Sequence, residues 1–582
     1  MKLLIAAAIC ILFFEGYVFI QHESTTNTAL EARNKVFQYK QKFTVGCSVN
    51  IAAFDPADPA NEIPLLDGWG NYRMPVTAAN DSAYIYFQQG INMYYGFHII
   101  EALASFEKSI KFDSSFAMGY WGKALSYGPN INDLGYSASP EALLAAGKSM
   151  SLSSNNTPVE KALINAMSVR YSADTTQTRE QLNQLYADAM KQVHERFPES
   201  TDAATLYADA LMLQHPWDLY DRYGQPKAWT PQIVALLESI LKANFQHPGA
   251  AHYYIHAVEA SNHPEKALKV SAELPSLMPG VSHLVHMPAH IYIRTGNYDK
   301  GLDVNRQAIK GYDNYLSKYP AVVNNSPLYL IHNLHMEATC ANMSARYADA
   351  VKASDDCRNS FEESLQDMPD FFGIYVQYIY MTPLFTQIRF GKWDDILNTP
   401  AIPSAHVYAN LLWHYARGLA FARKNDLVNA AKELDSLQSD LKNEQLQAPA
   451  PNYANPGING ARVAEKILMG VMKEEQQYLD TAAAYFSEAA ALEDAMIYDE
   501  PKDWPQPARQ YWGNVLLKAG QYAAAEQVFE KDLELNPDNG WSLTGLSTAL
   551  AKQGKTAEAA AIKKQAAKAF EKSDVKVTAA VF

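Results

Sequence analysis

Cysteine is scarce in this chain, which has four cysteines among 582 residues and no CxxC pair. So few cysteines cannot form a disulfide scaffold, and the spacing offers no zinc ribbon or thioredoxin-like site. Cys340 and Cys357 could meet across an antiparallel helix pair, but the favoured interpretation is two free, buried thiols. The sequence therefore does not point to cysteine chemistry as the function.

Runs of basic residues are also absent. The net charge is −14, from 63 acidic and 49 basic residues, and Lys and Arg do not cluster anywhere. Proteins that bind phosphate backbones need a positive surface. We therefore expect no nucleic acid among the partners. The composition, 48% hydrophobic and 19% charged, is that of a globular protein and not of a disordered one.

Long apolar runs are missing except at the N-terminus. Residues 1–24 begin with Met1-Lys2, continue with an apolar run from Leu3 to Phe14, and read as an export signal. Cleavage and retention as a membrane anchor both remain open. No later stretch approaches the roughly 18 apolar residues of a spanning helix. We expect the rest of the chain to be periplasmic, extracellular, or membrane-anchored and facing outward.

Strand-like alternation is absent, and helical spacing dominates after a short lead-in. Residues 25–81 are rich in turn-formers and predict an extended segment. From about residue 82, apolar residues recur at three and four spacings in stretches broken by Gly, Asn or Asp-Pro. This pattern predicts an all-α fold of antiparallel helix pairs with no substantial sheet.

The helical pairs repeat with a fixed period. Gly520 and Ala525 are followed 34 residues later by Gly554 and Ala559. Within 506–537 the pattern Gly513, Gly520, Tyr522, Ala525, Phe529 and Pro537 resembles the tetratricopeptide repeat (TPR). The resemblance implies a TPR-like α-solenoid over 82–445, a Pro-rich linker or loop over 446–460, and C-terminal TPR repeats over 461–582.

Histidine is concentrated in one window. Nine of the 15 histidines fall between His247 and His335, 89 residues in which an even distribution would place about two. Repeat frames starting at 248, 282 and 331 put seven of them at matched places of three first helices, together with Glu259 and Arg294. These seven are His252, His256, His283, His286, His290, His332 and His335. Because these places lie within a narrow arc, we expect the seven rings to line one concave groove.

Two imidazoles four residues apart on a helix can bind one metal ion. The imidazole-rich set suits Zn, Cu, Ni or Fe. We expect the pairs His252/His256 and His286/His290 to form the first coordination shell, with Glu259 as the general base of a metal-dependent enzyme. The alternatives are a metal-free groove for an anionic or peptidic ligand, and a TPR scaffold that binds a protein or peptide without catalysis.

Several longer segments add a more specific resemblance. HYYIHAVE, HLVHMPAHIYIR, IHNLH and YDEPKDWPQPARQ, in this order, are similar to a group of exported bacterial TPR proteins with His-rich central repeats. The resemblance points to candidate residue positions, but it does not imply which reaction, if any, the protein catalyses. It implies roles for Asp499, Glu500, Trp504 and Arg509, with Glu500 and Arg509 as ligand-binding candidates beside Asp499. It does not support a role for His98, where the group tends to read Phe-Asn-His.

Overall fold

The structure is a computed structural model that describes residues 54–582 apart from 57, 133–138, 320–326 and 452–453. The predicted export signal 1–24 and most of the predicted lead-in therefore lie outside the described residues. From Phe54 to Asn80 the described chain is largely irregular, with one short 3-10 helix, η2 (Pro59–Asn61).

Helices build almost all of the rest, as the spacing predicted. The N-terminal half contains α2 (Asp81–Tyr95), α3 (Ile99–Phe112), α4 (Ala117–Ser126), α5 (Pro140–Leu152), α6 (Pro158–Ser168), α7 (Arg179–Arg196), α8 (Thr201–Met212), α9 (Thr230–Ala243), α10 (Pro248–Val258), α11 (Leu268–Leu277), α12 (Ser282–His286), α13 (Pro288–Arg294) and α14 (Tyr298–Lys318). Short 3-10 turns, η3 (Ser153–Asn155) and η4 (Pro264–Ala267), follow α5 and α10.

The C-terminal half continues the same way. It contains α15 (Pro327–Met343), α16 (Tyr347–Asn359), η6 (Glu363–Asp367), α17 (Asp370–Tyr380), α18 (Thr382–Arg389), α19 (Trp393–Leu397), α20 (Val407–Arg423), α21 (Leu427–Asp440), η7 (Glu444–Gln447), α22 (Gly457–Glu475), α23 (Leu479–Asp494), α24 (Ala508–Lys518), α25 (Tyr522–Leu535), α26 (Gly540–Lys552) and α27 (Thr556–Ala569). Among the described residues the sole β pairing is an isolated bridge between Tyr220 and Pro226. The predicted all-α solenoid is confirmed.

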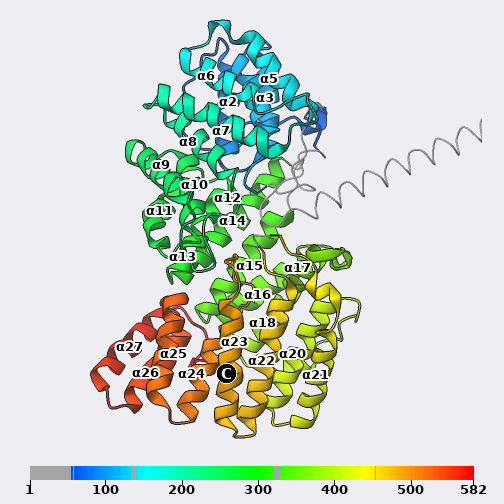
Figure 1. Cartoon of the computed structure of the whole chain (residues 1–582), viewed down its shortest axis with the longest axis vertical. Coiled ribbons are helices and arrows are strands. Elements are labelled where there is room, and N and C mark those ends of the chain that lie inside the picture. The colour runs from blue at the N-terminus through cyan, green and yellow to red at the C-terminus, as the bar shows by residue number, and fades with distance from the viewer. Residues whose placement is uncertain (1–53, 57, 133–138, 320–326, 452–453) are drawn as a thin grey trace, which may run out of the picture.

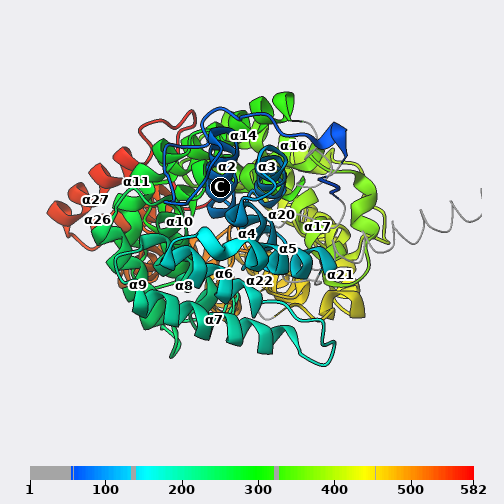
Figure 2. The same ribbon diagram turned by 90° about the horizontal axis from the view of Figure 1, so that it is seen from above.

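The helices form two stacked bodies (Figure 1). The upper body holds α2 to α14, and the lower body holds α15 to α27. Viewed from above, α26 and α27 project at one edge and α17 and α21 lie toward the opposite one (Figure 2). The largest core cluster runs from Phe54 to Tyr319 and the second runs from Ile331 to Val581, while two smaller clusters join α13 and α14 of the upper body to α15 and α26 of the lower one.

Small residues let the paired helices approach closely. A Cβ on Gly513 or Gly545 would lie 2.5 Å or 2.2 Å from Cζ of Phe529, which is therefore clamped between α24 and α26. The same contact recurs at the N-terminus, where a Cβ on Gly90 would lie 2.7 Å from Cε1 of Phe106. Glycine on a first helix facing phenylalanine on a second helix is thus the physical basis of the repeat seen in the sequence.

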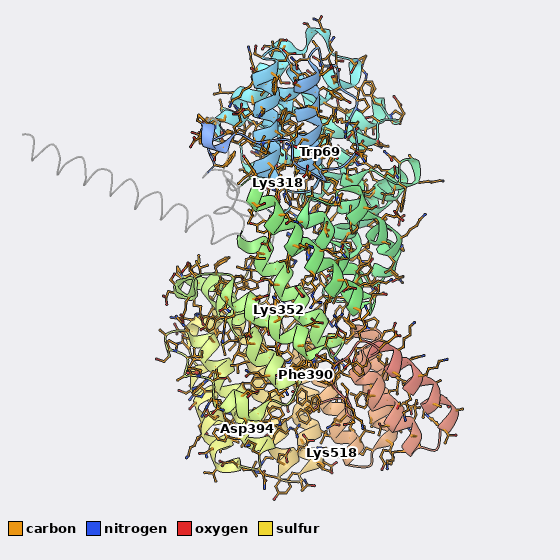
Figure 3. All side chains as sticks on the ribbon, turned by 180° about the vertical axis from the view of Figure 1, so that it is seen from behind. Trp69, Lys318, Lys352, Phe390, Asp394 and Lys518 are labelled. Carbon is orange, nitrogen blue, oxygen red and sulfur yellow. The ribbon has the colours of Figure 1, made fainter. Side chains whose placement is uncertain are left out.

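The C-terminal repeats pack back onto the middle of the chain. Phe390, labelled in Figure 3, lies between the ring of Tyr347 on α16 and the ring of Trp541 on α26, with centroids 4.9 and 6.0 Å away. After α27, the Asp574 carboxylate accepts hydrogen bonds from the backbone N–H groups of Tyr347 (2.6 Å) and Ala348 (2.8 Å). The tail therefore caps the start of α16 and fixes the lower body below α15.

No helix in the part of the chain that the structure describes is long and apolar enough to cross a membrane. Cys340 and Cys357 are both buried and free, so the interpretation as two free thiols is confirmed.

Candidate metal centre

Four helices bring six histidines together where the upper body meets the lower one. α10 carries His252 and His256, α12 carries His283 and His286, α13 carries His290, and α15 carries His332. Five of the six are buried, with 5% exposure or less, and His332 is partly exposed. The structure divides them into two neighbouring groups of three.

The first group, which we call the α10 triad, consists of His252, His256 and His283. Nε2 of His252 lies 3.1 Å from Nε2 of His256 and 3.0 Å from Nε2 of His283. The three nitrogens therefore face one point. Phe97 packs against the triad: its ring lies edge-on to that of His252, with centroids 4.5 Å apart, and stacks on that of His283, with centroids 5.9 Å apart.

The second group, which we call the α13 triad, consists of His286, His290 and His332. Nε2 of His290 lies 2.8 Å from Nε2 of His286 and 3.5 Å from Nε2 of His332. The triads adjoin each other, since ring centroids of His256 and His290, and of His283 and His286, are 6.0 Å apart.

In His252, His256 and His286 the other ring nitrogen, Nδ1, has an acceptor that holds the ring in place. His252 Nδ1–H donates to the carbonyl oxygen of Tyr95 (2.6 Å), and His256 Nδ1–H donates to Glu259 Oε1 (2.9 Å). His286 Nδ1–H donates to Asn305 Oδ1 (2.6 Å), while the Asn305 amide donates to the Gly301 carbonyl and so is fixed in that orientation. An acceptor at Nδ1 is the usual arrangement around metal-binding histidines.

These partners leave bare nitrogens facing each other. With the proton on Nδ1 of both His252 and His256, each Nε2 carries a lone pair, and the two lone pairs are 3.1 Å apart. The same holds for His286 and His290 at 2.8 Å, since Nδ1 of His290 faces carboxylates. Two ligands of one tetrahedral zinc ion stand about 3.3 Å apart, given Zn–N bonds of 2.0–2.1 Å. A cation between the nitrogens removes the repulsion.

Burial favours the neutral form of four of these histidines, which is the form that binds a metal. Burial lowers the pKa of His252 and His283 well below the ordinary value, and neighbouring imidazoles lower it further. Burial likewise lowers the pKa of His286 and His332 well below that value, with His290 and His286 respectively as the strongest neighbours. The site thus presents uncharged imidazoles in a solvent-poor setting.

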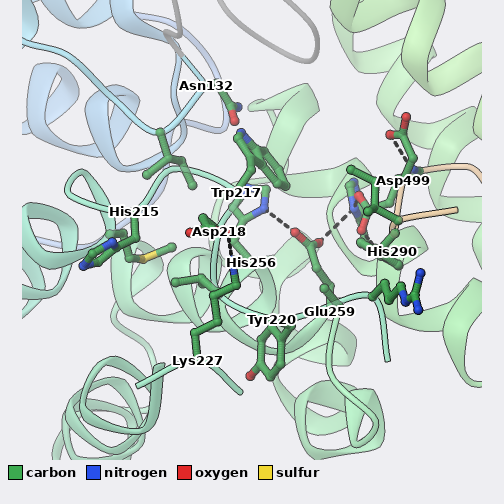
Figure 4. Close-up of a pocket in the computed structure, with 18 of the residues that line it drawn as sticks. Asn132, His215, Trp217, Asp218, Tyr220, Lys227, His256, Glu259, His290 and Asp499 are labelled. Atoms are coloured by element: carbon green, nitrogen blue, oxygen red, sulfur yellow. Dashed lines mark hydrogen bonds and ion pairs between the residues drawn. The ribbon is translucent and has the colours of Figure 1, made fainter. Parts of the chain in front are cut away.

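Glu259 links the two triads (Figure 4). Its Oε1 accepts from His256, and its Oε2 lies 3.0 Å from Nδ1 of His290. Burial acts to raise the pKa of Glu259, but His256 and His290 outweigh burial and lower it. The carboxylate was expected to be a general base. Because both of its oxygens face imidazole nitrogens, the carboxylate is placed to orient one ligand in each triad, and its role as a general base stays a prediction.

Two other predicted residues reach the centre from the segment after α23. The Glu500 carboxylate forms an ion pair with Nδ1 of His290 and accepts a hydrogen bond from the Tyr498 hydroxyl. Glu259, His290 and Glu500 form a third group able to hold an ion. Since the two carboxylates share the N–H of His290, we assign them to its orientation. Asp499 lines the adjoining cavity, and burial raises its pKa well above the ordinary value.

Arg294 lies nearby without touching the histidines: its guanidinium donates to the Ser261 carbonyl (2.7 Å) and sits over the Tyr498 ring. Arg509, predicted to bind ligand, forms a two-fold contact with the Asp494 carboxylate between α24 and α23 and is not part of the centre. Trp504 is buried against Phe385 and Tyr415.

His335 also departs from the predicted set. It lies on α15 close to His332, but its ring packs edge-on against Tyr378 of the lower body (5.4 Å) and it belongs to none of the three groups. Successive residues of a helix rotate by about 100°, so His335 points about 60° away from His332. His98, for which no role was expected, instead contacts Glu101 (3.2 Å).

The structure groups these histidines differently from the expected first shell, which stays a prediction. We expected His252/His256 and His286/His290 to bracket one ion, whereas His283 completes the α10 triad and His332 completes the α13 triad. The chain reinforces this division, because α12 ends at His286 and Pro288 starts α13 without an N–H to donate.

We predicted that the histidines would line an open groove. In the structure they instead border a cavity of about 260 Å³. His256 and His283 of one triad and His290 and His332 of the other all line it. The opposite walls come from the loop after α8, from α17, and from the segment after α23. They include Trp217, Leu219, Tyr220, Tyr375, Ile497 and Tyr498.

Trp217, in this wall of the cavity, has an unusual backbone conformation. Its φ is +57°, rare for a bulky residue, and its ring stands edge-on to His256 with centroids 5.3 Å apart. Its buried indole N–H has no hydrogen-bond partner in the structure. Strained backbone next to a cluster of ligating side chains is a feature of functional sites.

The sequence reasoning missed the residues that orient the histidines. Asn305 sits on α14, and the Tyr95 carbonyl lies at the end of α2, 157 residues before His252. Asn305 lies one helical turn after Gly301, which is the small residue of the repeat starting near 282. This spacing is the one sequence signal that places Asn305 where two helices cross. Nothing in the sequence signals the Tyr95 carbonyl, because every residue has one.

The comparisons with known proteins bear on the fold. Residues 516–579, which cover α25 to α27, match the tetratricopeptide repeat family. The C-terminal helix pairs are therefore similar to tetratricopeptide repeats. The resemblance to TPR proteins is confirmed there, and the resemblance of the His-rich segments to a particular group stays a prediction.

Solved structures with similar folds include a human IFIT1 dimer with m7Gppp-AAAA, 13% identical, covering 85% of this chain and 91% of that chain, with a TM-score of 0.28. The TPR domain of P58(IPK) is 12% identical and covers 81% of this chain and 99% of that chain, with a TM-score of 0.22. No curated protein matches the chain.

Proposed function

We propose that this protein is a TPR-repeat metalloprotein that binds two transition-metal ions, one in each histidine triad, and presents them to a small molecule in the adjoining cavity. The observation that carries the proposal is the facing of bare Nε2 atoms, 3.1 Å apart in the pair His252/His256 and 2.8 Å apart in His286/His290. Each pair is completed by a third imidazole. Three protein ligands with an open fourth position are typical of catalytic metal sites.

The ligand chemistry narrows the choice of ion. The triads contain imidazoles alone, which suit Zn, Cu, Ni or Fe and do not suit Mg or Ca. Two carboxylates, the buried Glu259 and the partly exposed Glu500, support the ligands without belonging to either triad. A metal-dependent enzyme remains part of this proposal. Residues 1–24 support export, so that the metal would be acquired outside the cytoplasm.

The test is the metal content of the full chain and of matched variants. Metal-stripped protein, dialysed against Zn²⁺ and then against buffer, should retain about two ions per chain by mass spectrometry. His256→Ala should retain about one, and the double variant His256→Ala/His290→Ala none. His263→Ala is the control, since His263 is exposed and lies outside both triads. Equal metal content in all four proteins would refute the proposal, and circular dichroism would verify that each is folded.

A second function is favoured by a separate observation. A groove between α23, α24 and α25 is lined by Trp512, Arg509 and Lys531 and adjoins the matched repeats. We propose it as the surface for a protein or peptide partner, apart from the buried histidines. The net charge of −14 supports a partner that is not a nucleic acid. Crosslinking of a partner to this groove that persists in His256→Ala/His290→Ala would separate the two functions.

A further inference from the structure

The two triads open onto one cavity, which suggests a shared ligand. His256 and His283 line it from the α10 triad, and His290 and His332 line it from the α13 triad. Neighbouring rings that belong to different triads have centroids 6.0 Å apart. This is no farther than the 6.1 Å between the centroids of His256 and His283 within the α10 triad. A diatomic molecule in the cavity could therefore reach ions in both triads.

The charges around the triads limit the ions that fit. An imidazole that binds a metal ion through Nε2 and keeps its proton on Nδ1 carries no charge, and the carboxylates that touch these rings are Glu259 and Glu500. Arg294 directs its guanidinium to the Ser261 carbonyl and not to these carboxylates. Two singly charged ions therefore match the two carboxylates. Two doubly charged ions would leave two positive charges uncompensated in a buried site, unless an anion bridged them.

Copper meets two requirements of the site: it binds imidazole ligands well, and it has a singly charged state. Imidazole is a good ligand for copper, and Cu(II) binds nitrogen ligands more tightly than the other divalent first-row ions. Three imidazoles also make a trigonal set that suits Cu(I). Zinc has one oxidation state under these conditions, so it cannot move between the singly and doubly charged arrangements.

We infer that the paired triads form a coupled dicopper site whose ligand is dioxygen, a conclusion that rests on the proposed two-metal function. Each Cu(I) gives one electron to O₂, which becomes a peroxide dianion bridging two Cu(II) ions. Two electrons leave the metals and two enter O₂, and no proton is needed. The bridging dianion supplies the two negative charges that the oxidised pair requires. The buried Phe97 ring contacts the His252 ring and the Trp217 ring contacts the His256 ring, so aromatic side chains border the site.

The experiment uses the full chain, loaded anaerobically with Cu(I) and then exposed to air. We expect about two copper ions per chain, uptake of one O₂ per copper pair, and almost no Cu(II) electron paramagnetic resonance signal, since bridged Cu(II) spins cancel. His332→Ala should disrupt the α13 triad, abolish O₂ uptake at the pair, and produce the ordinary signal of an isolated Cu(II). His335→Ala is the control on the same helix and should behave as the unaltered protein.

Two results would overturn the inference. Two copper ions that give the full Cu(II) signal in air would show uncoupled sites, and retention of two zinc ions without O₂ uptake by the copper form would show a different chemistry. Both results leave the proposed two-metal function intact. Failure to bind any metal would instead refute both proposals. If His332→Ala does not fold, His256→Asn, which acts on the other triad, provides the same comparison.

Discussion

Glu259 is the residue through which the two metal sites are linked, and replacing it is the sharpest perturbation of the centre. In Glu259→Gln, the amide oxygen can accept from one imidazole, while the amide NH₂ faces the Nδ1–H of the other. Loss of such a supporting partner costs about 10–100-fold in metal affinity, or about 1.4–2.7 kcal/mol. Because Glu259 contacts one ligand of each triad, we expect both sites to weaken.

The assay is a competition titration with a chromophoric zinc chelator, fitted with two sites. Asn305→Ala is the comparison, since Asn305 holds only His286 and should weaken only the α13 triad. Glu265→Gln is the control, because Glu265 pairs with His263 in an exposed contact outside the centre. If Glu259→Gln bound two zinc ions within twofold of the unaltered affinity, the role assigned to this carboxylate would be refuted.

Three further outcomes follow from the structure. Burial lowers the pKa of His335 to about 3. As pH falls below about 6.5, this imidazole is therefore protonated in the unfolded chain while it is still neutral in the folded protein. Through this residue the free energy of unfolding of the metal-free protein should therefore fall by about 2 kcal/mol between pH 6.5 and 5. Urea midpoints measured at the two pH values should show a smaller fall in His335→Met. A fall of equal size in that variant would contradict the prediction. Gly545→Ala, whose Cβ would meet Phe529, should destabilise by about 1–3 kcal/mol in thermal unfolding. Gly147→Ala on α5, where a Cβ meets nothing, should stabilise by about 0.5–1 kcal/mol, and the same sign for both glycines would refute the packing argument. Zinc at 100 times its dissociation constant should stabilise the protein by about 2.7 kcal/mol, read as a rise in melting temperature that a chelator reverses and that is absent in His256→Ala/His290→Ala.

The fold was accessible from the sequence because the repeat is a local pattern. The 34-residue spacing of Gly520 and Gly554 reflects helix pairs that each turn back on themselves, and both glycines adopt positive φ, +73° and +80°, in the loops between helices. Likewise, the pairs His252/His256 and His286/His290 follow from helical geometry alone.

The grouping of the histidines depends on contacts between helices that the repeat frame does not specify. His283 joins α10 because α12 lies beside it, and His332 reaches the α13 triad from α15, 42 residues after His290. The role of Glu500 depends on a segment 210 residues from His290 that folds back against α13. Equivalent places in aligned repeats therefore predicted which side chains gather, but not which three share an ion.

The most direct test of the central claim is anomalous diffraction from crystals of the metal-loaded full chain, recorded on both sides of the absorption edge of the metal. The account predicts two peaks per chain, one about 2.0–2.1 Å from Nε2 of His252, His256 and His283, and one equally close to Nε2 of His286, His290 and His332. Peaks confined to exposed histidines such as His263, with both triads empty, would contradict it.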